Sequence, residues 1–295
     1  MGTFGGHVMP GVFFLLFSLY YSVLMSLALL RGQSFLKPPL PPREKRRHSW
    51  WQLIPVEGVI KVTTTLLGIL LELFYPPGAN RLMIVDWEDP QRPFVFKDNW
   101  QHITMYMFFL ASGVVDTVSQ SFQARQNIKL ERAAEALAFW VLALLMMSHV
   151  ENKSLMEIRV HTFFIVPTIL VSLVLTIEVW VPDQPPLWVL KCWMGLVLSN
   201  WLLQLSVLMY VPPSGQPWRA ENPIDLAFLS TFFCWHLGLG AALLAAVYGL
   251  CSLWHHRCSS WTEALEAKYQ PCPTGYRDEE LEKLREETKL QDGDV

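Results

Sequence analysis

The chain has 295 residues, of which 52% are hydrophobic and 17% are charged, with 13 tryptophans and a formal net charge of −3. A soluble domain carries about a quarter charged residues, so this chain has too few to cover a water-facing surface of its size. The composition excludes a disordered chain, a coiled coil and a basic nucleic-acid-binding protein, and it favours a protein that lies in a lipid bilayer.

Seven segments are long and apolar enough to cross a membrane as helices, because a span needs about 20 mostly apolar residues. They lie near residues 8–30, 53–74, 102–122, 132–149, 161–181, 188–211 and 225–254. The segments between several of them are rich in proline and charge, which breaks helices and suits water better than lipid. The predicted fold is therefore all-α, a polytopic seven-helix transmembrane bundle.

The distribution of charge predicts an orientation and two parts of the chain. Residues 31–47, in the first loop, hold six Lys and Arg, and residues 258–295 hold five Lys and Arg against ten Asp and Glu, a net charge of −5. Positive loops favour the cytosol. We expect an integral protein of the plasma membrane or an endomembrane, with its N-terminus outside or lumenal and its C-terminus cytosolic. Residues 1–257 form the predicted membrane domain and residues 258–295 a flexible acidic tail.

Ionisable residues within the predicted spans are costly in lipid and need partners or a route to water. Glu57 and Lys61 are four residues apart on one helical face, which predicts an ion pair. Glu72, Glu178 and Lys191 lie near span ends, where we expect their side chains to reach the headgroups.

Histidines gather at one level of the predicted bundle. His7 precedes the first span, His102 opens the third, His149 closes the fourth and His161 opens the fifth, all on the outer side. His236 is expected roughly 16 Å below that surface, at about 1.5 Å of rise per residue. Imidazole is the commonest protein ligand of zinc, and three His ligands with an open position can activate a water molecule. The alternative is that each histidine only caps a helix or bonds an interfacial group.

Several short motifs resemble the transmembrane protein 45 / transmembrane epididymal protein family. They are Gly6-His7-x-x-Pro10-Gly11, Gln101-His102-x-Thr104-Met105-Tyr106, Glu135-Ala136-x-Ala138-Phe139, Tyr210-x-Pro212-Pro213-Ser214-Gly215 and Phe233-Cys234-Trp235-His236. Their order and spacing match from residue 1 to about residue 255. The resemblance implies a seven-span membrane protein of undefined biochemical activity.

The resemblance also implies a set of candidate site residues. It keeps the five histidines together and adds Glu135 as an acidic member. Family members have His-x-His after the fourth span, whereas this chain has His149-Val150-Glu151, in which a carboxylate replaces the second imidazole. The candidate metal ligands are His7, His102, His149, His161, His236 and Glu151. Asp116 and Glu135 are candidate supporting groups, zinc is the candidate cofactor, and no catalytic residue is assigned.

The sequence leaves three candidate functions. The first is a membrane protein without catalysis, whose histidines bind a metal ion or fasten the helix ends. The second, by analogy of layout with seven-helix membrane enzymes, is a zinc hydrolase of a lipid amide or ester. In it His102, His161 and His236 would be ligands, and Asp116 or Glu135 would be an acid/base group or a group that supports the ligands. The third, a transporter or channel, has no visible inverted repeat to support it.

The expected partners are the lipid bilayer and a second copy of the chain, and not nucleic acid. Two rows of small residues on the last span are typical of close helix packing and favour a homo-oligomer. They are Gly238, Ala242 and Ala246, and Ala241, Ala245 and Gly249.

Overall fold

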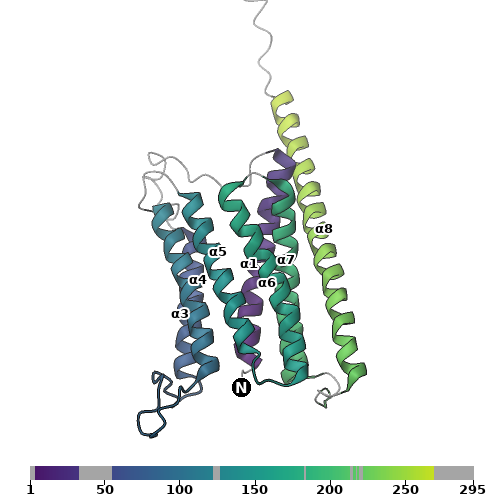
Figure 1. Ribbon diagram of the computed structural model, residues 1–295. Helices are drawn as coiled ribbons and strands as arrows, with labels where there is room; N and C mark the ends of the chain where they lie inside the picture. The colour runs from purple at the N-terminus through teal and green to yellow at the C-terminus, as the bar shows by residue number, and fades with distance from the viewer. Residues whose placement is uncertain are drawn as a thin grey trace, which may run out of the picture. The chain divides into compact units, whose positions relative to one another are not determined.

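The structure, a computed structural model, describes residues 4–32, 55–121, 127–182, 184–212, 215–216, 218 and 222–268, with side chains as far as Arg257. Apart from one isolated bridge between Val85 and Phe94, the regular structure of these residues is helical, so the predicted all-α class is confirmed. The helices are α1 (Phe4–Arg31), α3 (Val56–Phe74), α4 (Lys97–Ser121), α5 (Ile128–His149), α6 (Leu155–Trp180), α7 (Pro185–Tyr210) and α8 (Pro223–Lys268), and Figure 1 shows them.

Capping residues explain why several helices begin before the predicted spans. Asn127 accepts a hydrogen bond from the backbone N–H of Leu130 at the start of α5, and Ser154 and Glu157 form a capping box at the start of α6. Proline at the first positions of α7 supplies a backbone angle that suits a helix. Hydropathy locates only the apolar part of each helix, whereas the helix itself continues to its polar cap.

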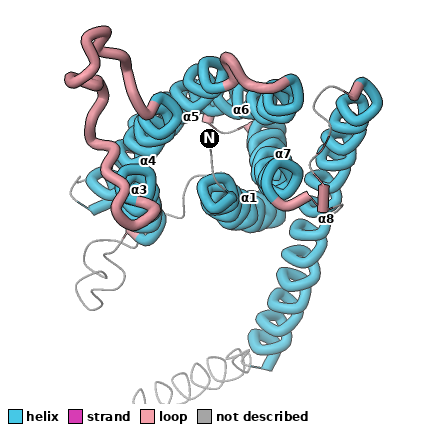
Figure 2. The backbone as a smooth tube through the Cα atoms, turned by 90° about the horizontal axis from the view of Figure 1, so that it is seen from below, coloured by secondary structure: helices cyan, strands magenta, loops and turns pink. Residues whose placement is uncertain are grey.

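The helices pack in an order that follows the chain. Close packing joins α3 to α4, α4 to α5, α5 to α6 and α6 to α7, and α1 returns to pack against α7. Figure 2 shows these helices along an arc, with α1 on its concave side. Residues 1–251 form one compact unit, and the described part of the second unit, residues 252–268, continues α8.

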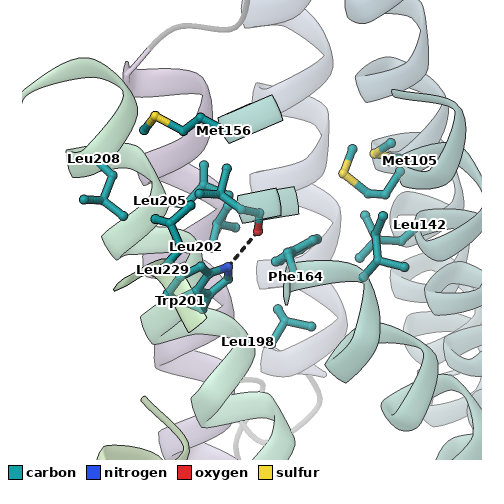
Figure 3. Packing of buried hydrophobic residues seen from close by; sticks show 13 residues of the cluster. Met105, Leu142, Met156, Phe164, Leu198, Trp201, Leu202, Leu205, Leu208 and Leu229 are labelled. Carbon is teal, nitrogen blue, oxygen red and sulfur yellow. Dashed lines mark hydrogen bonds between the residues drawn. The ribbon is translucent and has the colours of Figure 1, made fainter. Parts of the chain in front are cut away.

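The largest buried apolar cluster joins α4, α5, α6, α7 and the start of α8. Trp201 on α7 is fully buried at its centre, and its indole N–H donates to the carbonyl of Val160 at 2.8 Å. Figure 3 shows Phe164, Leu205 and Leu229 around it, one from each of three helices. A buried indole N–H without an acceptor would be costly, so this hydrogen bond lets the large ring occupy the core.

Within the described ranges, four helices are long and apolar enough to cross a membrane: α1, α6, α7 and the segment Pro223–Arg257 of α8. The helices α3, α4 and α5 are not among these four, and their crossing of the bilayer stays a prediction, as does the orientation. Most of the basic first loop and most of the acidic tail lie outside the described residues.

Two glycines let α3 and α4 approach closely. A Cβ added at Gly113 would lie 2.8 Å from Cβ of Lys61 and 3.0 Å from the backbone nitrogen of Val62, and one added at Gly58 would lie 3.0 Å from the carbonyl oxygen of Gly113. Both distances to backbone atoms are shorter than ordinary van der Waals contact, so the helices would have to move apart.

We therefore expect Gly113→Ala to lower the free energy of unfolding by about 1–3 kcal/mol, the usual cost of overpacking. The measurement is thermal unfolding in detergent micelles, followed by tryptophan fluorescence. Gly249→Ala is the matched control, because no described atom outside its own helix neighbourhood lies within 4 Å of a Cβ built there. An equal effect of the two substitutions would contradict the close approach of α3 and α4.

Candidate functional site

Four histidines from four helices meet at the end of the bundle that holds the start of α1; we call them the histidine cluster. They are His7 on α1, His102 on α4, His149 on α5 and His161 on α6. The ring centroids of His102 and His149 are 5.0 Å apart, and those of His149 and His161 are 5.5 Å apart. His7 lies 6.0 Å from His161 and 6.3 Å from His102, which closes the circle.

Hydrogen bonds orient three of these rings. Nδ1 of His102 lies 3.0 Å from Oε1 of Glu72, and Nδ1 of His161 lies 2.7 Å from the carbonyl oxygen of Glu157. Nδ1 of His149 lies 3.0 Å from Oε1 of Gln101. Because each partner is an oxygen acceptor, Nδ1 carries the proton and donates, which leaves Nε2 with a free lone pair. Among the described residues, Nε2 of these three histidines has no hydrogen-bond partner.

The surroundings of the cluster are charged but well paired. Lys153 donates to Asp98 at 2.6 Å, and Asp98 in turn lies 3.8 Å from Nδ1 of His149. Burial acts to raise the pKa of the Asp98 carboxyl, but the hydrogen bond from Lys153 and the nearby positive charge outweigh it and lower the pKa. Asp98 therefore stays ionised close to the cluster.

The other candidate residues lie elsewhere. His236 packs against the ring of Trp201, with centroids 5.5 Å apart, and lines a different cavity with Gln204. Asp116 and Glu135 contact Lys61 instead of the histidines. The side chain of Glu151 is 66% exposed and lies 3.8 Å from Lys97. The structure thus brings together four of the predicted ligands and separates the rest from them.

The described residues contain no group of three or more His, Cys, Asp or Glu side chains that is already arranged to hold a metal ion. The imidazoles of the histidine cluster are nevertheless donors of a type that zinc accepts. An ion about 2.0 Å from each imidazole nitrogen in a tetrahedral site would place ring centroids about 5 Å apart. The observed separations of 5.0 to 6.3 Å are at or somewhat above that value.

A cavity of about 90 Å³ lies directly below the cluster. His7, His102 and His161 form its polar end, and its other walls are almost entirely apolar. A molecule with an apolar part could therefore place a polar group against these histidines.

Charged residues deeper in the bundle form a second cluster, which we call the buried charge network. Its members are Glu57, Lys61, Asp116, Arg132, Glu135, Glu178 and Lys191. The ammonium of Lys61 lies 3.0 Å from Glu57 and 2.8 Å from Asp116, and the hydroxyl of Tyr21 on α1 donates to Glu57. The predicted Glu57–Lys61 pair is thus present.

Arg132 and Lys191 extend the network to α6 and α7. Arg132 lies 3.1 Å from Glu135 and 3.8 Å from Glu178, and Lys191 donates to Glu178 at 2.5 Å. The expectation that Glu178 and Lys191 reach the headgroups separately is therefore wrong: both are buried and they pair with each other. The spacing of Arg132 and Glu135, three residues apart on one helix, is the only sequence signal for this part of the network.

We expect Lys61→Met to destabilise the protein by about 3–5 kcal/mol, because removing one partner leaves buried carboxylates without their counter-charge. Lys97→Met is the control, since Lys97 and Glu151 are 46% and 66% exposed and such a pair contributes little. Thermal and denaturant unfolding in the same detergent measures both. Similar stability of the two variants would show that the network does not hold the helices together.

The chain matches known sequences along most of its length. Residues 128–249 match a family model described as a family of unknown function (DUF716). Transmembrane epididymal protein 1A of Mus musculus is 34% identical over 100% of this chain and 95% of its own length. Transmembrane epididymal protein 1 of Rattus norvegicus is 35% identical over 88% of this chain and 83% of its own, and that of Homo sapiens is 33% identical over 77% and 82%. Together with the apolar helices, these matches show that the chain is an integral membrane protein that belongs to the transmembrane epididymal protein family.

Proposed function

We propose that this membrane protein binds a divalent transition-metal ion, zinc foremost, at the histidine cluster, and that the bound ion joins the ends of α1, α4, α5 and α6. The observation that carries the proposal is the arrangement of His102, His149 and His161. Each donates through Nδ1 to an oxygen and keeps Nε2 free. Metal-binding histidines in proteins are oriented in this way by their outer hydrogen bonds.

The chemistry of the cluster favours a borderline-soft ion over a hard one. Four imidazoles offer nitrogen ligands, which suit zinc, copper and nickel, whereas magnesium and calcium prefer oxygen. Burial of His7, His149 and His161 excludes competing water from most of the site. The ring centroids are 5.0 to 6.3 Å apart, so if their Nε2 atoms face a common point, a small contraction of the ring of imidazoles would bring them to coordinating distance.

The test is the metal content and stability of the full chain purified in detergent. We expect about one zinc per chain, consistent with one tetrahedral site, and a lower unfolding temperature in the presence of a chelator. His102→Ala and His161→Ala should lose the metal, whereas His256→Ala, on α8 and outside the cluster, should keep it. Glu72→Gln, which weakens the acceptor for His102, should reduce zinc affinity about 10- to 100-fold.

Two results would overturn the proposal. One is a protein without stoichiometric metal after purification and after incubation with zinc. The other is a chelator that leaves the unfolding temperature of the wild type unchanged. In either case the histidines would serve only to fasten the helix ends through hydrogen bonds and ring contacts.

A second candidate is a zinc-dependent hydrolase of a lipid amide or ester. The observation in its favour is the apolar cavity that ends at His7, His102 and His161, where a lipid tail would bring its linkage to the metal. The roles imagined for His236, Asp116 and Glu135 have no support in their positions, and Glu72 and Asp98 are the carboxylates beside the cluster instead. Zinc-loaded protein that releases no product from a panel of lipid amides and esters would leave metal binding without hydrolysis.

A further inference from the structure

A second cavity, of about 100 Å³, lies further along the interior between α1, α3, α4 and α5. Aromatic rings form most of its wall, with Phe13, Phe14 and Phe17 from α1, and Phe109 and Phe139 from α4 and α5. Lys61, Thr65, Ser112 and Glu135 also line the cavity, although nearly all of its surface is formed by apolar atoms. The cavity is therefore mainly apolar with a few polar side chains in its wall, which is the usual character of a small-molecule site.

Ser112 is the polar group that the protein leaves without a partner. Its side chain is 1% exposed, and its hydroxyl has no hydrogen-bond partner among the described residues. A buried hydroxyl without a partner costs about 1–3 kcal/mol, so buried hydroxyls almost always find one. Serines elsewhere in the bundle follow that rule, since Ser172 donates to the carbonyl of Thr168 at 2.8 Å. Because Ser112 is one of the residues that line the cavity, a bound molecule that reaches its hydroxyl would supply the missing partner.

The charges among the polar side chains of the wall define the kind of head group that fits. Lys61 is already occupied by Glu57, Asp116 and Glu135, at distances of 2.8 to 4.0 Å. An ionic head would have to compete with these pairs, whereas a neutral hydroxyl or amide can both donate to and accept from Ser112. The favoured head group is therefore neutral and hydrogen-bonding.

The cavity lies beside one pair of helices that is not closely packed. Both α1 and α3 line it, but α1 with α3 is not one of the closely packed helix pairs in the described part of the chain (Figure 2). Exposed apolar side chains of these two helices, among them Leu16 on α1 and Leu67 on α3, suit contact with lipid chains. A ligand could enter from the bilayer between α1 and α3, and a long tail could remain in that seam.

We propose that this cavity binds a neutral single-chain lipid with a hydroxyl or amide head group, whose head bonds to Ser112 and whose chain contacts the phenylalanine rings. The volume of about 100 Å³ has room for the head group and only the first part of one chain, so the first parts of two chains would not fit. None of the four histidines of the cluster lines this cavity, so the proposal does not depend on metal binding.

The test uses the full chain in phosphatidylcholine vesicles and a fatty alcohol that carries a photoreactive diazirine near its hydroxyl end. We expect saturable labelling of peptides from α1 and α4, displaced by unlabelled alcohol. Ser112→Ala should reduce the saturable labelling about five-fold, the factor that corresponds to one hydrogen bond. Ser112→Leu, which also fills the cavity, should abolish it. Ser172→Ala is the matched control, because it removes a buried helix hydroxyl that does not line this cavity.

Further arms of the experiment separate the head group from the chain. A probe with a carboxylate head and one without any polar head should both label the cavity less than the alcohol does. Thermal unfolding confirms that each variant is folded, and zinc content should be the same in Ser112→Ala and the wild type. Equal labelling of wild type and Ser112→Ala would overturn the proposal. So would equal labelling by the carboxylate probe, or labelling that is not saturable.

Discussion

Lys61 joins three helices through its charge, and the interior of the bundle is organised around it. Its ammonium lies 3.0 Å from Glu57 on its own helix, 2.8 Å from Asp116 on α4 and 4.0 Å from Glu135 on α5. A buried ammonium is tolerated only when carboxylates surround it. A change in the spacing or rotation of these helices would therefore break an ion pair of Lys61. Water is not available there to solvate the separated charges.

This constraint separates the interior into regions with different chemistry. The histidine cluster lies at one end, where its members come from helix ends and are oriented by Glu72, Gln101 and the carbonyl of Glu157. The buried charge network lies further along the same helices, and the two phenylalanine-lined cavities occupy the space between. Paired charges hold these helices together, while the histidine cluster and the hydroxyl of Ser112 are the groups to which our two proposals assign ligands.

The sequence predicted what depends on position along each helix and missed what depends on the arrangement of helices around one another. The level of His7, His102, His149 and His161 follows from their places at span ends, so their meeting could be anticipated. The depth of His236 along its helix could also be predicted from the sequence. Its position beside Trp201 could not be predicted, because hydropathy does not tell which helices are neighbours. For the same reason the pairing of Lys191 with Glu178, on α7 and α6, had no local signal.

Residues 223–251 are the part of α8 that belongs to the first unit, and they contact the core through a narrow strip. This strip includes Leu229, which is buried in the largest apolar cluster. It also includes Gly240, where an added Cβ would lie 2.8 Å from the side chain of Val197. The two rows of small residues on α8 are mostly exposed. No residue of α8 lines the cavity of about 90 Å³ at the histidine cluster or the cavity of about 100 Å³ beside Ser112. Substitutions on the exposed surface of α8 can therefore adapt the protein to a different bilayer or a different neighbouring protein. Such substitutions leave the residues that line the two cavities unchanged.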